Sequence, residues 1–216
     1  ELFFARAEAL GDAPFLWRKT DDRWQAISWR QAAERVARIA TALRARGLAK
    51  GDRVVLVSEN RPEFCLFDLG IMAAGGVSVP TYTTNTVRDH QHILENSGAA
   101  AAVVSTAKLA KPLLETAIHS SHCRLLISLE KPGHAQAPES LELLHVDDLL
   151  AGVVADVAAV RAAVDAGRAD LACLIYTSGT GGAPRGVSQH HGAILLNIAG
   201  CAEILRNDFP PTRGAE

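Results

Sequence analysis

Short apolar runs recur along this chain and alternate with stretches whose apolar residues follow a helical period. The runs lie at residues 54–57, 77–80, 101–104, 125–128 and 171–175. A run that is apolar at successive positions is typical of a parallel strand covered on both faces. Strands separated by helices at this rhythm predict an α/β fold in which helices layer around a mainly parallel sheet.

The stretches between these runs carry helix and turn signals. Ser28 with Gln31, and Thr86 with Asp89, fit the capping pattern at a helix start. Two apolar segments around the polar residues 20–22 predict a β-hairpin. Gly47 is expected to stop the helix that follows Ser28. The predicted helices cover residues 2–10, 28–47, 62–74, 86–98, 107–120, 154–167 and 191–206. In the last of these helices, Ile194, Leu195, Ile198 and Leu205 are expected to face inward. Residues 131–140 are predicted to form a surface loop.

The most informative local pattern is the loop Tyr-Thr-Ser-Gly-Thr-Gly-Gly-Ala-Pro-Arg-Gly at residues 176–186. It follows the apolar run 171–175 directly, so a buried strand is predicted to end in it. Glycines allow a concave ring of backbone N–H groups, and hydroxyls and an arginine add further donors for an anion. The loop matches neither a Walker A motif nor a dinucleotide-binding fingerprint. A flexible linker is the alternative, but linkers rarely adjoin a buried strand. A polyphosphate ligand is therefore the first hypothesis.

Composition and charge exclude several classes of protein. The 216 residues carry a net charge of −2, which gives no electrostatic case for a nucleic-acid partner. No apolar segment is long enough to predict a transmembrane helix, and the first residues do not resemble a secretory signal. The four cysteines are widely spaced, so reduced thiols in a cytoplasmic protein are expected and a metal site is not.

The segment 170–187 resembles the signature loop of the adenylate-forming (AMP-binding) superfamily, whose pattern is roughly Y-T-S-G-T-T-G-x-P-K-G-V. That superfamily includes acyl-CoA synthetases, luciferases and adenylation domains of peptide synthetases. Gly181 stands where a second Thr is usual. Arg185 stands where Lys is usual, so a planar guanidinium group replaces a compact ammonium group. The resemblance extends to the N-terminal part of the fold through residues 28–31, 50–63 and 71–80. Tyr82, Thr83 and Thr84 are more similar to the long-chain fatty acid–CoA ligase branch.

This resemblance implies an enzyme, an AMP-forming acyl-CoA ligase. A carboxylate, preferably a fatty acid, would attack the α-phosphate of ATP, and coenzyme A would then take the acyl group from the adenylate, releasing AMP; the cofactors implied are ATP, Mg²⁺ and coenzyme A. His191 matches a histidine that often follows the loop and is a candidate on the substrate side, although a polar residue at a helix start is an equally good interpretation. The residues implied to hold the polyphosphate are Thr177, Ser178, Gly179, Thr180, Gly181, Gly182 and Arg185.

The resemblance also implies parts that this sequence does not contain. The catalytic Lys, an acidic Mg²⁺ motif and a ribose-binding Asp would lie beyond Glu216, and the chain has no initiator Met. Residues 1–206 are therefore expected to be a partial N-terminal AMP-binding domain, inactive alone, with 207–216 as a disordered tail. The alternatives are a non-catalytic short paralogue that serves as a binding or assembly module, and an adenylation domain that loads a carrier protein. Chain length of the acid and oligomeric state are left open.

Several further polar or aromatic positions have two interpretations each. Tyr176 is predicted to be a core aromatic residue with its hydroxyl at the surface. His90 and His92 could line a cleft near Tyr82, but a solvated helix face is favoured. The adjacent Asp147 and Asp148 are interpreted as charges at a helix start rather than as a metal pair.

Overall fold

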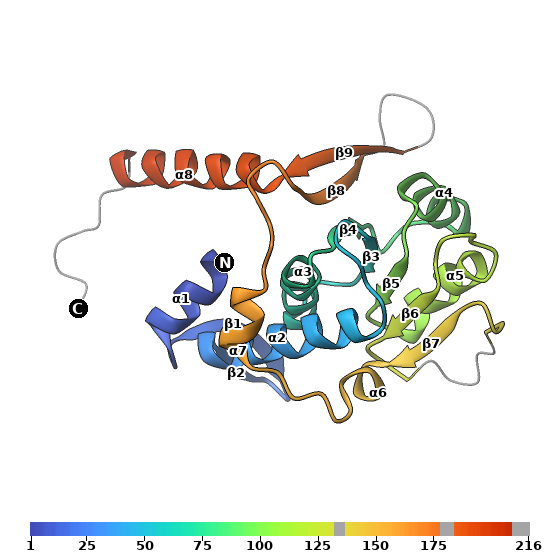
Figure 1. Cartoon of the computed structure of the whole chain (residues 1–216), viewed down its shortest axis with the longest axis horizontal. Helices are drawn as coiled ribbons and strands as arrows, with labels where there is room; N and C mark the ends of the chain where they lie inside the picture. Colours follow the sequence, from blue (N-terminus) through green and yellow to red (C-terminus); the bar gives the residue numbers. More distant parts are fainter. Residues whose placement is uncertain (132–136, 178–183, 209–216) are drawn as a thin grey trace.

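A computed structural model describes residues 1–131, 137–177 and 184–208 of the chain. Its centre is a seven-stranded sheet in the order β7-β6-β5-β3-β4-β8-β9, with helices on both faces (Figure 1). All neighbouring strands are parallel except β8 and β9, which are antiparallel. The predicted α/β fold with a mainly parallel sheet is confirmed. The strands are β3 Arg53–Val57, β4 Val77–Thr81, β5 Ala101–Val104, β6 Leu125–Ser128, β7 Glu142–His145, β8 Leu171–Thr177 and β9 Arg185–His190.

Two hydrophobic cores lie on the two faces of the sheet. Helices α2 (Trp29–Ala45) and α3 (Pro62–Ala74) pack with Val54 and Leu56 of β3 on one face. Helices α4 (Val87–Ser97) and α5 (Ala107–Ala117) pack with Val55 and Val57 on the other. Successive residues of a strand point to opposite faces, so the unbroken apolar run of β3 is what a sheet covered on both sides requires.

The remaining helices of the N-terminal half and the middle of the chain gather around α2. They are α1 (Leu2–Leu10), α6 (Val146–Leu150) and α7 (Val157–Ala162). The predicted caps are present: Ser28 and Gln31 form a capping box at α2, and Thr86 and Asp89 form one at α4. In each box a side-chain oxygen accepts a hydrogen bond from an otherwise unpaired N–H of the first turn.

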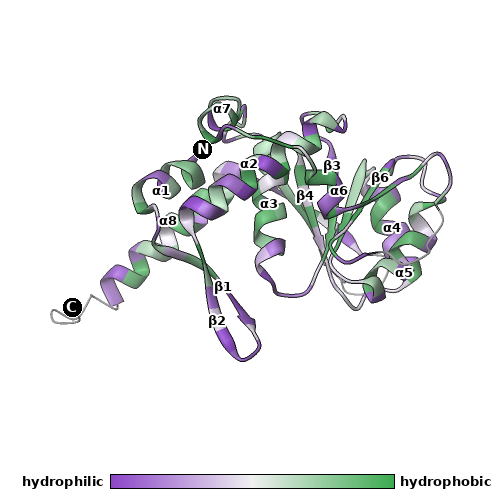
Figure 2. Ribbon diagram, turned by 90° about the horizontal axis from the view of Figure 1, so that it is seen from below, coloured by the Kyte–Doolittle hydropathy of each residue, from purple (hydrophilic) through white to green (hydrophobic). Residues whose placement is uncertain are grey.

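A two-stranded hairpin, β1 (Pro14–Thr20) and β2 (Arg23–Ser28), projects from the body of the molecule (Figure 2). Its turn residues Asp21 and Asp22 have positive φ values of 47° and 59°. Two such residues in succession make the tight turn whose twist matches that of the flanking strands. The hairpin predicted around residues 20–22 is therefore confirmed.

The structure corrects the predicted secondary structure after residue 140. Strand β7 was not predicted, and of helix α6 only the start at Asp147 and Asp148 was, because four- and five-residue elements give too little periodicity to recognise. The helix predicted over 154–167 is only α7, which Asp156 caps through its side chain and which ends by Ala163. Strand β9 was also missed: its run Arg-Gly-Val-Ser-Gln-His has one large apolar residue, and its pairing with β8 rather than its own pattern makes it a strand.

Helix α8 (His191–Asp208) begins where predicted and extends two residues into the segment expected to be a tail; residues 209–216 lie outside the described part. Ile194 and Leu195 are half-buried in a groove against α1 and α3. Ile198 and Leu205, which were predicted to face inward, are 59% and 57% exposed. The prediction was wrong for these two because α8 runs past the described body of the domain (Figure 1).

Candidate functional site

The two strands β8 and β9 form a hairpin whose connection is the glycine-rich loop. Thr177, the last residue of β8, lies opposite Arg185, the first residue of β9, and both are exposed. The structure therefore brings these two predicted site residues together at the base of the loop. The other predicted phosphate-binding residues lie outside the described residues; they are Ser178, Gly179, Thr180, Gly181 and Gly182.

Helix α4 holds this hairpin through two hydrogen bonds. The hydroxyl of Tyr176 donates to Oδ1 of Asn96 at 2.7 Å, and Nε2 of His92 lies 2.8 Å from the carbonyl oxygen of Pro184, next to the loop. The rings of His92 and Tyr176 also meet edge to face, with centroids 6.3 Å apart. His92 and Asn96 are four residues apart on α4, so they lie on one side of the helix. The loop is thus tied to a rigid element on both of its flanks.

Next to the loop, strand β9 lies close to the Tyr176 ring of β8. A Cβ on Gly186 would lie 3.1 Å from Cζ of Tyr176, so a side chain there would press against the ring. Tyr176 is 4% exposed, which confirms its predicted core role, and its hydroxyl reaches the exposed Asn96. Burial raises the pKa of Tyr176 and keeps its hydroxyl protonated as a donor.

His90 departs from its prediction. It was expected on a solvated helix face, but it is 1% exposed and lies on the buried face of α4. Within the described part of the chain, its Nδ1 has no hydrogen-bond partner. Burial lowers the pKa of His90, with the nearby charge of Asp89 acting in the opposite direction. The reason for the error is the rotation of α4: Thr86 and Asp89 fix the start of the helix so that His90, Ile93 and Leu94 face the sheet.

His191 lies at the opposite end of the hairpin from Thr177 and Arg185. The register pairs His190 with Leu171, at the start of β8, so His191 is separated from the loop by the length of that strand, about 20 Å. Its backbone N–H donates to the carbonyl oxygen of Asp170 at 3.0 Å. Burial lowers the pKa of the His191 side chain, and Asp170 opposes this effect. The structure does not bring His191 together with the loop.

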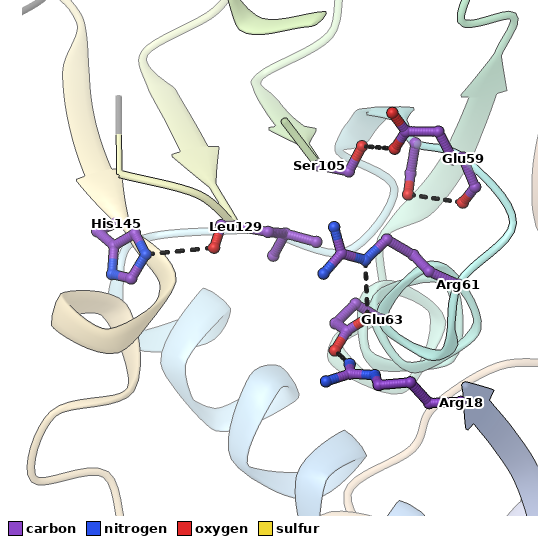
Figure 3. Close-up of polar contacts among 8 residues, drawn as sticks. Arg18, Glu59, Arg61, Glu63, Ser105, Leu129 and His145 are labelled. Atoms are coloured by element: carbon purple, nitrogen blue, oxygen red, sulfur yellow. Dashed lines mark hydrogen bonds and ion pairs between the residues drawn. The ribbon is translucent and has the colours of Figure 1, made fainter. Parts of the chain in front are cut away.

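A second group of polar residues lies at the carboxyl ends of β3 and β5, and the sequence pattern did not reveal it. The hydroxyl of Ser105 donates to Glu59, and Glu63 pairs with both Arg61 and Arg18 (Figure 3). Burial works against ionisation of Glu59, but the bond from Ser105, a backbone N–H and the charge of Arg61 together lower its pKa. The sequence signal that could have revealed this group is the presence of polar residues directly after two buried strands.

The acidic side chains of the described residues do not gather into a metal centre. Asp147 and Asp148 lie in the first turn of α6, as predicted for charges at a helix start. Over residues 1–131, 137–177 and 184–208, no group of three His, Cys, Asp or Glu side chains could hold a metal ion. No helix among the described residues is long and apolar enough to cross a membrane.

Comparison with known proteins identifies the family. The chain is 32% identical to the long-chain-fatty-acid–CoA ligase FadD15 of Mycobacterium tuberculosis over 184 residues, covering 85% of this chain and 29% of that protein. It is 31% identical over 186 residues to tyrocidine synthase 3 of Brevibacillus parabrevis, covering 86% of this chain and 2% of that protein. The crystal structure of the N-terminal domain of FACL13 from Mycobacterium tuberculosis superposes with a TM-score of 0.71 at 25% identity, over 94% of this chain and 46% of that one.

The chain thus spans less than a third of the length of the first curated relatives. The sequence model of one family, described as AMP-binding enzyme, matches residues 3–213. That match covers the sheet, both cores and the β8–β9 hairpin, and it agrees with the signature loop at residues 176–186. The chain belongs to the AMP-binding enzyme family.

Proposed function

We propose that the protein containing this chain activates a carboxylic acid, preferably a fatty acid, with ATP and passes the acyl group to coenzyme A. The observation that carries the proposal is the β8–β9 hairpin, which places Thr177 and Arg185 at the base of a glycine-rich loop in a member of the AMP-binding family. Relatives named as long-chain-fatty-acid–CoA ligases support the choice of substrate class.

The residues of this chain would act on the polyphosphate. The hydroxyl of Thr177 and the guanidinium of Arg185 are exposed on neighbouring strand ends, where both can donate to phosphate oxygens. Each charge-assisted hydrogen bond contributes about 1.5–3 kcal/mol. Spreading the charge of the triphosphate over fixed donors lowers the cost of bringing a carboxylate to its α-phosphate. Ser178, Thr180 and the glycine amides of the loop would supply the remaining donors.

The other residues that the reaction requires would lie outside this chain. The Mg²⁺ ligands, the ribose-binding carboxylate and the catalytic lysine would come from the portion of the relatives that this chain does not span. We therefore expect the 216-residue chain alone to be inactive. Reduced cysteines are consistent with the cytoplasmic location expected for such an enzyme.

The test is ATP–pyrophosphate exchange by the full-length protein with a panel of carboxylates of increasing chain length. Exchange that requires a fatty acid, followed by acyl-CoA formation when coenzyme A is added, is the expected result. Absence of carboxylate-dependent exchange across the panel would reject the proposal and would favour the non-catalytic binding module.

Transfer to a carrier protein is a second candidate, and the similarity to tyrocidine synthase 3 favours it. The first half-reaction is common to both candidates, so only the acceptor separates them. Offering the acyl-adenylate both coenzyme A and a phosphopantetheinyl carrier protein, and detecting the thioester by mass spectrometry, shows which acceptor is used.

A further inference from the structure

The residue that precedes β9, Pro184, is held by a side chain from a different element. Proline has no N–H, so its carbonyl oxygen is the backbone group through which this position can be held. Nε2 of His92 lies 2.8 Å from that oxygen. Helix α4, which carries His92, lies beside the loop end of the β8–β9 hairpin (Figure 1). The contact therefore holds the peptide group that leads into Arg185.

The atoms of this contact determine which form of His92 makes it. A carbonyl oxygen only accepts hydrogen bonds, so Nε2 must carry a proton. In the neutral imidazole this tautomer leaves Nδ1 as an acceptor, whereas the imidazolium donates from both nitrogens. Both of these forms donate to the carbonyl oxygen of Pro184.

The ring of His92 is itself held in place. It meets the ring of Tyr176 edge to face, at an interplanar angle of 90°. Tyr176 is 4% exposed, and its hydroxyl donates to Asn96, one turn further along α4. Because neighbours already restrict the ring of His92, its bond to Pro184 costs little further side-chain entropy.

Helix α4 is a firm base for this contact. Its residues Ile93 and Leu94 are each 1% exposed, and a capping box closes its first turn. At its other end, Arg53 of β3 donates to the carbonyl oxygens of Ser97 and Gly98, in both cases at 2.6 Å. Both ends of the helix are thus fastened, so a side chain on α4 keeps its position relative to the sheet.

The position of Arg185 follows from the peptide group before it. The peptide bond is planar, so a fixed carbonyl group of Pro184 also fixes the N and Cα atoms of Arg185. A guanidinium binds phosphate through a rigid planar fork, which makes the contact sensitive to where the side chain begins. A displacement of about 1 Å in a reacting site can cost about a hundredfold in rate.

We infer that His92 is a positioning residue, which holds the peptide between Pro184 and Arg185 so that the guanidinium meets the polyphosphate of ATP. The inference rests on the proposed function, which supplies the identity of the ligand. It gives α4 a part in ATP binding although His92 itself need not touch the nucleotide.

ATP–pyrophosphate exchange by the full-length protein tests this role. His92→Leu removes the donor and should raise the KM for ATP about two- to tenfold, the range expected for one hydrogen bond, while the KM for the carboxylic acid stays unchanged. His92→Gln places an amide N–H near the position of Nε2 and should restore most of the wild-type KM for ATP. Gln91→Ala, at an exposed position of the same helix, is the matched control and should behave as wild type.

A merely structural role of His92 gives a different result. Partial unfolding reduces the amount of active enzyme, which lowers kcat and leaves the KM values unchanged. A wild-type KM for ATP in His92→Leu, with or without a fall in kcat, would therefore overturn the inference. A raised KM for ATP that His92→Gln fails to lower would also overturn it.

A double variant checks that His92 acts through Arg185. In a protein that already carries Arg185→Ala, the further change His92→Leu should have little effect on the KM for ATP. An equal effect of His92→Leu with and without Arg185 would refute the inference, because His92 would then act on another group.

Calorimetric titration of ATP with Mg²⁺ separates this inference from the proposed function. If wild type shows carboxylate-dependent exchange but His92→Leu binds ATP equally tightly, the inference is refuted and the proposed function stands. If no carboxylate supports exchange, yet His92→Leu binds ATP about two- to tenfold more weakly than wild type, the proposed function is rejected and the positioning role is supported. Absence of ATP binding by wild type refutes both.

Discussion

The contact between α2 and α3 depends on the absence of a side chain at Gly70. A Cβ at that position would lie 2.5 Å from Cγ2 of Ile39 and 2.9 Å from its Cβ. Carbon atoms that are not bonded are normally about 3.5–4.0 Å apart. Ile39 cannot turn away, because it is 3% exposed and its branched side chain has one strongly preferred rotamer in a helix. The change Gly70→Ala must therefore push the two helices apart.

The expected cost follows from two opposing effects. Overpacking costs about 1–3 kcal/mol, and the fixed position of the Ile39 Cβ places this case at the upper end. Replacing Gly by Ala within a helix returns about 1 kcal/mol. We expect Gly70→Ala to lower the free energy of unfolding by about 2 kcal/mol.

Gly200 offers the matched control for the same chemical change. It lies in α8, where an added Cβ would meet nothing within 4 Å, so Gly200→Ala should raise stability by up to about 1 kcal/mol. Urea denaturation followed by circular dichroism measures both variants. A Gly70→Ala protein as stable as wild type would refute the inferred close approach. A double variant with Ile39→Ala should be less destabilised than the sum of the single changes.

Three further predictions concern the hairpin and α4. Tyr176→Phe removes the hydroxyl bonded to Asn96 and should cost about 0.5–1.5 kcal/mol in urea denaturation; unchanged stability would show that the bond contributes nothing. Because burial lowers the pKa of His90 below its ordinary 6.5, the unfolded chain binds a proton there that the folded chain does not, so stability falls as pH drops below 6.5. His90→Leu should show a smaller loss of stability between about pH 7.5 and 5.5, and an identical loss would contradict this reasoning. In the full-length protein, Arg185→Ala should reduce ATP–pyrophosphate exchange roughly ten- to a hundredfold, with Arg185→Lys less affected; an Ala variant with wild-type exchange would remove Arg185 from the site.

Local signals with a direct physical cause were predictable from the sequence. The runs at β3, β5 and β6 are apolar because both faces of the sheet are covered, and the capping boxes at α2 and α4 satisfy backbone groups within a few residues. The glycine-rich loop was recognised for the same reason, since its composition suits one kind of ligand. These features need no information about distant parts of the chain.

Features that depend on distant contacts were not predictable. Strand β9 exists because β8 pairs with it, and the burial of His90 depends on which side of α4 meets the sheet. The contact of His92 with Pro184 joins residues 92 positions apart. The burial of Ile198 and Leu205 was predicted but is not observed. A helical pattern predicts an apolar face, but it does not say which part of the protein covers that face.

The position of β9 at the end of the sheet order has a practical consequence. Among the described strands it pairs with β8 alone, so one row of its backbone N–H and C=O groups is left open. Such a border is a template on which another strand can add by hydrogen bonding, whatever its side chains. Its own charges are Arg185 and one histidine, His190, which give weak electrostatic protection at neutral pH. A preparation of this segment alone is therefore expected to associate through intermolecular β-pairing at this border, and the replacement of Ser188 by Lys or Pro is the first remedy to try.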